Sequence, residues 1–328
     1  MLAEDCGHPS ANFQESPHLI KSEPMMNNPL PPVDTPNDFD IYENVNYRHY
    51  WRSLSRQKLD ELERSILDEL LPTHGHAIVD LGCGYGRLFS QYAGRFQHVV
   101  LFDGSESLLR QAQADFKEKA FYVLGDIEHL PFRAAAFDTA LLVRVFHHLN
   151  HPEEVVSAIR RLLCGNGLFI MNYSNKRNAL QIIKFLFMMT RHNPFTPETL
   201  KAEANFFHHH PASITRLMAG AGFQSLVHRG AGVFDKIAPL LGPIHRFAPT
   251  GKRLAPFLGK TALAPWVFCK AELSDHIPRQ TFEKNSDLLA CPVCHNELSQ
   301  KDAAFCCTHC ALEYPIRHGI VDMRMINR

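Results

Sequence analysis

The chain has 328 residues, enough for one large α/β domain and a second, small domain. Lysine plus arginine and aspartate plus glutamate number 34 each, so charge alone does not make the whole chain a binder of polyanions. No apolar run reaches the roughly 18 residues of a membrane span, and residues 1–5 lack the basic and apolar regions of a signal peptide. We therefore expect a soluble, cytoplasmic protein.

The N-terminal part of the chain divides into two stretches. Residues 1–38 hold seven prolines and no periodic apolar pattern, so we expect a disordered tail. Residues 39–72 gather tyrosines around Trp51, and leucines then recur at helical spacing. These helices either pack plainly on a sheet or form a lid over its ligand, with Arg48 and His49 as lid contacts.

Residues 77–88, AIVDLGCGYGRL, are the most informative stretch. A buried strand is predicted by its apolar run, glycines follow at alternate positions, and apolar residues then recur at helical spacing over 88–93. Strand, glycine loop and helix let a backbone contact a nucleoside cofactor at the carboxyl end of a strand, although a glycine turn without a ligand is the alternative. The third glycine comes one residue earlier than in the dinucleotide fingerprint, and Asp80 precedes the first.

Further strands follow in chain order, at 99–102, 121–124, 137–143 and 168–171. The first of these ends at Asp103, nineteen residues after Gly84. An acid at this place accepts both hydroxyls of a ribose, or it caps the following helix, 108–116. A second helix is predicted at 153–163.

Segments in this order resemble the motifs of class I S-adenosylmethionine (SAM)-dependent methyltransferases. Residues 80–86 are similar to motif I, residues 125–132 to the family's G-D-x-x-x-L-P-F segment at the adenine, and residues 137–149 to its F-D…HHL run. The resemblance covers 76–175 and is closest to the group that includes ubiquinone and menaquinone biosynthesis methyltransferases. The cofactor residues it implies are Asp80, Gly82, Cys83, Gly84, Gly86, Asp103, Gly104, Ser105, Asp126, Ile127 and Arg144.

Histidines occur in two groups that could do chemistry. His147 and His148 follow the fourth strand beside the expected methyl group, and either could be the catalytic base for an acceptor hydroxyl. Packing or capping is an equal alternative. The consecutive histidines 208–210 cannot all point one way on a helix or strand, so we expect a loop or an element edge there rather than a metal site.

Residues 176–272 are expected to complete the sheet on the substrate side. A helix at 212–221, a strand from Phe223 and a seventh, antiparallel strand at 264–271 resemble the family's last elements. Residues 176–270 carry thirteen lysines and arginines against three acids. This excess either offsets acidic surface elsewhere, holds RNA phosphates, or meets anionic lipid headgroups beside the apolar stretch 179–189.

The last forty residues contain five of the nine cysteines, a concentration typical of metal binding rather than disulfides. Two C-x-x-C sequences can place four thiolates tetrahedrally around structural Zn²⁺, and Cys307 is preferred over its neighbour Cys306 because only Cys307 completes the second one. The expected ligands are Cys291, Cys294, Cys307 and Cys310.

The sequence around these cysteines resembles the short zinc-ribbon proteins that bind and activate methyltransferases in trans. Those activators serve RNA and translation-factor methyltransferases. The Asn-Pro-Pro-aromatic tetrad of the amide- and adenine-modifying partners is absent, because Arg144–His147 occupies its place. This departure argues against methylation of an amide or an exocyclic amine.

The expected fold is α/β, a Rossmann-like seven-stranded methyltransferase sheet with a small C-terminal zinc-ribbon domain. The methyltransferase domain spans 39–272, divided into lid helices 39–72, cofactor core 76–175 and substrate side 176–272. A linker, 273–286, leads to the ribbon, 287–328. The acceptor is expected to be a small or lipophilic molecule, with peripheral membrane contact left open. RNA is the first alternative, and an inactive, cofactor-binding scaffold subunit is the second.

Overall fold

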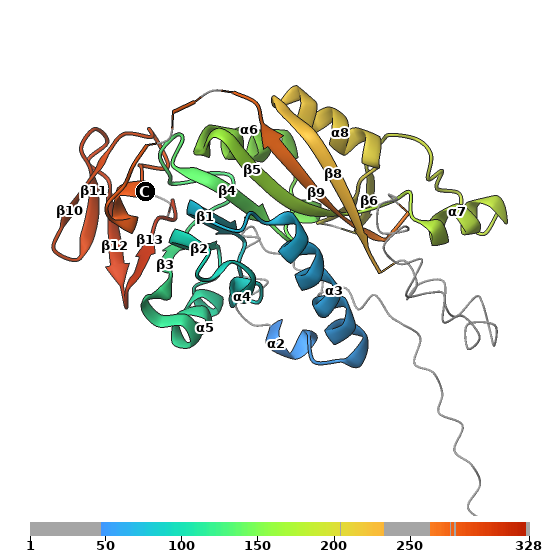
Figure 1. Cartoon of the computed structure of the whole chain (residues 1–328), viewed down its shortest axis with the longest axis horizontal. Helices are drawn as coiled ribbons and strands as arrows, with labels where there is room; N and C mark the ends of the chain where they lie inside the picture. Colours follow the sequence, from blue (N-terminus) through green and yellow to red (C-terminus); the bar gives the residue numbers. More distant parts are fainter. Residues whose placement is uncertain (1–46, 204, 233–262, 276, 279, 326–328) are drawn as a thin grey trace, which may run out of the picture. The chain divides into compact units, whose positions relative to one another are not determined.

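The computed structural model describes residues 47–203, 205–232, 263–275, 277–278 and 280–325 (Figure 1). The expected disordered tail, 1–38, lies outside these residues. Within the described part of the chain, no helix is both long and apolar enough to cross a membrane.

Seven strands form the expected methyltransferase sheet, in the order β3-β2-β1-β4-β5-β9-β8. Their bounds are β1 Gly75–Leu81, β2 Phe96–Asp103, β3 Phe121–Leu124, β4 Phe137–Leu142, β5 Leu163–Ser174, β8 Phe223–Ala231 and β9 Trp266–Leu273. β9 runs antiparallel to both of its neighbours, and the pairings among β1 to β5 are parallel. The expected α/β fold, including its antiparallel last strand, is therefore confirmed.

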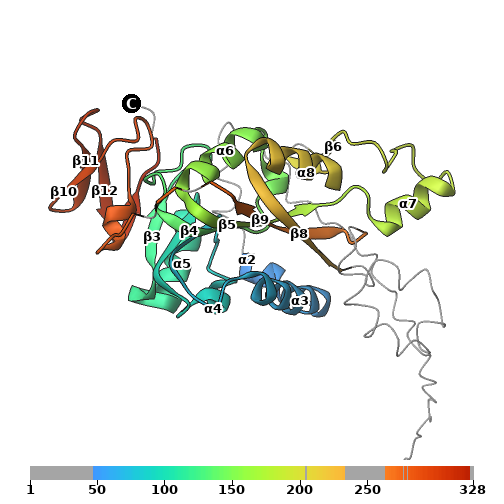
Figure 2. The ribbon, with the colours of Figure 1, turned by 45° about the horizontal axis from the view of Figure 1, so that its top comes forward.

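Helices cover both faces of this sheet, with α6 and α8 on one face and α3, α4 and α5 on the other (Figure 2). The helices are α2 Tyr47–Tyr50, α3 Leu54–Leu70, α4 Phe89–Tyr92, α5 Glu106–Phe116, α6 Pro152–Leu162, α7 Ala179–Leu186 and α8 Pro211–Gly220, with 3-10 turns η1 Lys117–Lys119, η2 Phe146–His148 and η5 Asn285–Leu288. Because both faces are covered, the central strands β1, β4 and β5 are mostly buried along their length rather than alternating between buried and exposed residues.

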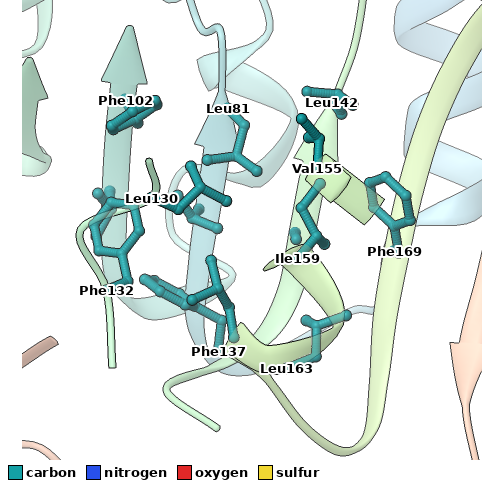
Figure 3. Close-up of a cluster of buried hydrophobic side chains, with 14 of the residues drawn as sticks. Leu81, Phe102, Leu130, Phe132, Phe137, Leu142, Val155, Ile159, Leu163 and Phe169 are labelled. Atoms are coloured by element: carbon teal, nitrogen blue, oxygen red, sulfur yellow. The ribbon is translucent and has the colours of Figure 1, made fainter. Parts of the chain in front are cut away.

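Two buried clusters result, one on each face of the sheet. Val79 and Leu81 of β1 point to the cluster under α6 and α8, whereas Ile78 points to the cluster under α3, α4 and α5. Figure 3 shows the first cluster, in which Phe132 and Phe137 meet edge to face with ring centroids 5.3 Å apart.

The C-terminal cysteine-rich part adds four strands to the same sheet. They are β10 Leu298–Lys301, β11 Ala304–Cys307, β12 Glu313–Arg317 and β13 Ile320–Asp322, paired antiparallel in that order. β13 then pairs in parallel with β3, from Ile320 opposite Tyr122 to Asp322 opposite Leu124. The described residues thus form one sheet of eleven strands, with the small domain at its β3 edge.

The segment expected as a linker, 273–286, contacts the methyltransferase core along its length. The Gly165 amide donates to the Ile277 carbonyl at 2.7 Å, and His98 Nδ1 lies 2.7 Å from Asn285 Oδ1. Leu289, just beyond it, pairs with Phe132 in an isolated bridge. These contacts hold both ends of the segment against the sheet.

The helix expected after the glycine loop is confirmed as the single turn α4, which ends there because the chain reverses at Gly94 (φ +82°) to enter β2. One local element differs from the expectation. A hairpin of β6 (Leu200–Glu203) and β7 (Phe206–His208) forms in a stretch where no strand was predicted. Its strands are too short to show, in the sequence, the alternation of apolar and polar residues by which a strand is recognised.

We predict that Gly165→Ala destabilises the chain by about 1–3 kcal/mol. A Cβ at this position would lie 2.6 Å from the Asp275 carbonyl oxygen and 2.7 Å from the Ile277 amide nitrogen, both of them backbone atoms that cannot rotate away. Urea unfolding measures the change.

Gly220→Ala, at the end of α8, is the matched control, since a Cβ there meets nothing within 4 Å. This second change should leave the unfolding midpoint unchanged or slightly higher, because alanine favours helix. Equal midpoints for the two variants would show that the 273–286 segment is not held at Gly165.

Candidate functional site

The glycine loop after β1 is joined directly to the acid at the end of β2. The Gly84 amide donates to Asp103 Oδ2 at 2.6 Å, and the Ser105 amide donates to Asp103 Oδ1 at 2.9 Å. A carboxylate offers about four lone-pair positions, so Asp103 can accept further hydrogen bonds from a ribose. The alternative role of Asp103 as a helix cap does not hold, because Ser105 is the residue that caps α5, accepting from the Leu108 amide at 3.3 Å.

Gly84 lies where a backbone contact with the cofactor is expected. Its φ is +56°, in the left-handed region that favours glycine. The nearest atom to a Cβ built there belongs to the Tyr47 ring, at 3.8 Å. A Cβ at Gly84 would therefore lie in ordinary van der Waals contact with Tyr47, so among the described residues the positive φ, rather than a close neighbour, favours glycine here.

The loops after β1 and β4 touch each other. A Cβ on Gly82 would lie 2.2 Å from Val145 Cγ2. Beside Val145, Arg144 has φ +66°, and its amide donates to Asn172 Oδ1 of β5 at 2.7 Å. Asn172 thereby holds the predicted cofactor residue Arg144 in an uncommon backbone conformation.

A buried carboxylate on α3 connects these two loops. Glu63 has no exposed surface, and its Oε2 accepts from Arg87 Nη2 at 2.8 Å while its Oε1 accepts from Arg144. Arg87 follows the glycine loop and Arg144 follows β4, so one acid holds the cofactor loop, the β4 loop and the N-terminal helix together. Breaking a buried charge network of this kind typically costs about 3–5 kcal/mol.

Two tryptophans surround the Arg144 guanidinium. Its carbon lies 3.6 Å from the Trp266 ring centroid and 5.7 Å from that of Trp51, and Arg87 stacks on Trp51 at 4.0 Å. Three donors on these neighbouring residues are buried and have no hydrogen-bond partner among the described residues: Trp51 Nε1, Arg144 Nε and Asn172 Nδ2. Buried donors of this kind fit a ligand with acceptor oxygens, such as the carboxylate of SAM.

Asp80, at the end of β1, is buried and accepts from the Tyr92 hydroxyl at 2.6 Å. Burial raises the pKa of Asp80 to about 6, against the lowering effects of the Tyr92 hydrogen bond and the Arg87 charge. A cation beside Asp80 would favour its ionised form. The carboxylate is therefore suited to the charged, methionine end of SAM.

The remaining predicted cofactor residues lie around the same loops. Cys83 is buried and its amide donates to the Phe102 carbonyl at 3.1 Å, and Gly104 connects Asp103 to the cap of α5. Asp126 accepts from the Glu128 amide at 2.9 Å and lies 3.1 Å from His129 Nδ1, so its carboxylate orders the turn after β3. Ile127 is half-buried against the core, and Gly86 (φ +75°) adjoins Phe116.

His147 and His148 lie together in η2, with ring centroids 4.1 Å apart. His147 is buried against Phe206 and Trp266, and its Nδ1 has no hydrogen-bond partner among the described residues. Burial, together with the neighbouring His148, lowers the pKa of His147 well below the ordinary value. His148 Nδ1 lies 2.7 Å from the Asn205 carbonyl oxygen. A carbonyl only accepts, so this contact places the His148 proton on Nδ1 and the lone pair on Nε2.

The three consecutive histidines point to different partners, as expected for an element edge. His208 bonds the Ser174 hydroxyl at 2.6 Å, His209 forms a bridge to Asn175, and His210 caps α8. Burial lowers the pKa of His209 to about 4, so this ring is neutral near pH 7. No metal cluster includes them within the described ranges.

The four predicted zinc ligands lie together. The sulfur atoms of Cys291, Cys294, Cys307 and Cys310 are all within 4.8 Å of one another. Tetrahedral zinc at about 2.3 Å from each sulfur needs sulfur separations of about 3.8 Å, and Cys294 and Cys307 are 3.5 Å apart. The cluster is therefore consistent with structural zinc.

The surroundings of the cluster also suit thiolate ligands. The Cys310 amide donates to Cys307 Sγ at 3.2 Å, and the Tyr314 hydroxyl lies 3.1 Å from Cys291 Sγ. Cys306, the neighbour of Cys307 on β11, points to the other side of the strand, toward Glu313 at 3.8 Å. Strand alternation thus separates the two adjacent cysteines.

Several residues of the site were not predicted from the sequence, among them Glu63, Arg87, Asn172 and Trp266. For Glu63 the signal was present: it falls on the apolar stripe of α3, four residues after Leu59 and three before Ile66. A charged residue on the buried stripe of an amphipathic helix marks a buried ion pair. For the other three, only the folded arrangement brings them to the site.

Two family models match the chain. Residues 79–171 match "Methyltransferase domain" and residues 284–319 match "Trm112p-like protein".

Curated relatives cover the first of these regions. The ubiquinone/menaquinone biosynthesis C-methyltransferase of Stutzerimonas stutzeri is 29% identical over 33% of this chain and 45% of its own length. The mitochondrial ubiquinone biosynthesis O-methyltransferase of Candida albicans is 28% identical over 35% and 38%. A malonyl-[acyl-carrier protein] O-methyltransferase of Halalkalibacterium halodurans is 30% identical over 40% and 50%. The chain spans about half or less of the length of these relatives.

Among solved structures, the chain resembles one from the complex between the Haloferax volcanii Trm112 methyltransferase activator and a protein assigned as a methyltransferase. The TM-score is 0.51 at 16% identity, over 74% of this chain and 100% of that one. This likeness concerns the fold. Together with the family models, it shows that the chain contains a class I, SAM-dependent methyltransferase domain followed by a Trm112p-like domain with a four-cysteine cluster.

We predict that the purified protein carries about one zinc ion per chain and that Cys294→Ser loses it. Cys291 and Cys307 belong to the same buried cluster as the sheet, so loss of the metal should lower the melting temperature of the whole chain. Metal analysis and calorimetry measure both effects. Cys306→Ser is the matched control and should keep its zinc. If Cys306→Ser instead loses zinc and Cys307→Ser keeps it, the fourth ligand is Cys306 and not Cys307.

We also predict that SAM affinity weakens by about tenfold between pH 7 and pH 5. Burial raises the pKa of Asp80 to about 6, and a cationic ligand favours the ionised form of this carboxyl group. Below pH 6, Asp80 must therefore lose its proton before SAM binds, and this weakens the affinity. Calorimetric titration at the two pH values measures this. Asp80→Asn should bind more weakly and lose the pH dependence, and an unchanged slope in that variant would assign the effect to another group.

Proposed function

We propose that this protein is an active SAM-dependent methyltransferase whose acceptor is a small or lipophilic molecule with a reactive hydroxyl group. The observation that carries the proposal is the hydrogen bond from the Gly84 amide of the glycine loop to Asp103, at 2.6 Å. It lies at the carboxyl ends of the strands, as do the η2 histidines that follow β4. Bound SAM supplies an electrophilic methyl group at this edge. Asp103, Asp80 and the three unpartnered donors are the groups that would hold it.

The residues after β4 supply the proton chemistry. His148 Nε2 carries the lone pair, because its Nδ1–H is committed to the Asn205 carbonyl. We infer that this nitrogen takes the proton of the acceptor hydroxyl as the oxygen–methyl bond forms and the sulfur–methyl bond breaks. His147, buried and neutral, packs behind it between Phe206 and Trp266 and fixes its position.

The walls of the site favour a flat or apolar acceptor. Trp266 and Phe206 lie next to the histidines, and the stacked rings of Tyr47 and Tyr50 lie beside Trp51. Aromatic faces contact apolar and aromatic ligands over a large area with little loss of conformational entropy. The names of two curated relatives refer to ubiquinone biosynthesis, which agrees with an acceptor of this type.

RNA is the second candidate, favoured by the Trm112p-like match at 284–319. The two candidates are separated by incubating the protein with SAM and either the organic-solvent extract or the RNA fraction of a cell lysate, and measuring S-adenosylhomocysteine. Turnover with the organic extract supports the proposal. Turnover that nuclease abolishes supports RNA, and SAM binding without turnover on any fraction supports an inactive scaffold.

We predict that His148→Ala lowers turnover by about 10²–10⁴-fold while the dissociation constant for SAM stays within about twofold of the original value. We place the imidazole on the acceptor side, so cofactor binding should not need it. Asp103→Ala is the contrasting variant and should weaken SAM binding by about tenfold or more, since it removes charge-assisted hydrogen bonds. Full turnover in the His148 variant would exclude it as the base.

A further inference from the structure

The end of α7 carries the largest concentration of exposed apolar side chains in the described part of the chain. Met188 is 93% exposed and Phe187 is 74% exposed. We call residues 186–195 the α7 tip. Its exposed apolar side chains are Leu186, Phe187, Met188, Met189 and Phe195, half of all the exposed large hydrophobic residues that the structure describes.

The charges around the α7 tip are of one sign. Lys184 lies just before it and Arg191 within it, Arg177 lies two residues before the helix, and no aspartate or glutamate occurs between Glu154 and Glu198. Basic side chains next to exposed apolar ones are complementary to a surface that is anionic outside and apolar beneath. An acidic protein surface would match the basic side chains but would leave the exposed apolar ones without apolar contacts.

Three amides at the end of α7 are hydrogen-bonded within the helix end. The Phe187 amide donates to the Ile183 carbonyl at 3.0 Å, Met188 to Phe185 at 3.0 Å, and Met189 to Lys184 at 2.7 Å. Met188 takes the left-handed conformation (φ +57°) common at such helix ends. Pairing these amides lowers the cost of bringing the helix end into an apolar medium.

The tip is connected to the edge of the sheet that holds the acceptor side of the site. β5 ends at Ser174, whose hydroxyl bonds His208 at 2.6 Å, and Asn178 then caps α7 by accepting from the Gln181 amide. In both views α7 lies beyond β8 and α8, clear of the covered faces of the sheet (Figures 1 and 2). Contact through the tip therefore leaves the cofactor loops uncovered.

We propose that the α7 tip is a membrane-docking surface, with its apolar side chains in the boundary between headgroups and acyl chains of an anionic bilayer. Lys184 and Arg191 contact the lipid phosphates. RNA fits the tip less well, because three of its five exposed apolar side chains, Leu186, Met188 and Met189, are not aromatic and offer no face on which bases stack. The docking proposal concerns a surface remote from the cofactor residues, so it does not depend on the function proposed above.

The test is co-sedimentation of the full chain with vesicles, either of phosphatidylcholine alone or of an equal mixture with phosphatidylglycerol. We expect partition to the mixed vesicles to exceed that to the neutral ones by about tenfold or more at low salt. Phe187→Ser with Met188→Ser should remove binding to both. Lys184→Glu with Arg191→Glu should remove the preference for the anionic vesicles.

Matched controls come from exposed residues elsewhere. Leu54→Ser, at a side chain 78% exposed, and Lys119→Glu with Lys301→Glu should partition like the unchanged protein. Calorimetric SAM binding, measured on every variant, reports the fold and the cofactor site separately. Normal SAM binding without vesicle binding would overturn the docking proposal alone, and vesicle binding without SAM binding would overturn the proposed function alone.

Two further outcomes overturn the docking surface. Equal loss of vesicle binding in the Leu54 control would mean that apolar exposure anywhere is enough. Binding of the α7 tip to purified RNA that is lost in the Lys184 and Arg191 variant, with no partition to vesicles, would assign the tip to RNA.

Discussion

The parallel pairing of β13 with β3 is the contact that makes one body of the two domains. β3 has only four residues, and Tyr122, Val123 and Leu124 are buried. Without β13, its hydrogen-bonding groups would form an open sheet edge, which proteins ordinarily cover. Because Cys291 and Cys307 lie in the same buried cluster as Phe132 and Phe137, the geometry of the cysteine cluster and the packing of the sheet are mutually dependent. The Met323 amide, bonded to the Leu124 carbonyl, extends this contact to the turn that carries Asp126.

Glu63 holds the cofactor loops together, as β13 holds the small domain to the β3 edge of the sheet. A buried carboxylate is costly to desolvate, and here two guanidinium groups compensate it. The arrangement does not primarily add stability, since apolar residues of similar volume could pack as well. It fixes the relative positions of Arg87 and Arg144, which come from loops at the ends of β1 and β4, and it makes α3 part of the site. The lid expected over 39–72 therefore has a specific link to the glycine loop.

The parts predicted from the sequence are those that local pattern determines. Apolar runs located the strands, alternate glycines located the loop beside Asp103, and cysteine spacing grouped the four thiolates that the structure brings together. Elements that depend on tertiary partners were not predictable: the docking of residues 273–286 on Gly165, the β6–β7 hairpin and the roles of Asn172 and Trp266. Residues 1–38, and residues 233–262 of the basic segment 176–270, lie outside the described ranges. Glu63 was predictable in part: the sequence places it on the apolar stripe of a helix, but it does not identify Arg87 and Arg144 as its partners.

The charges at the site bear on which acceptor atom it suits. Arg87 and Arg144 carry two positive charges that the Glu63 and Asp60 carboxylates balance, so the sulfonium of bound SAM would be left uncompensated by this network. His147 is held neutral by burial. An amine acceptor would arrive as an ammonium ion and meet like charges, with no acidic side chain beside the η2 histidines in the contacts that the structure describes. A hydroxyl meets no such repulsion, and its proton can pass to the proposed base, His148 Nε2. These charges therefore support our proposal that oxygen, rather than nitrogen, is the atom that receives the methyl group.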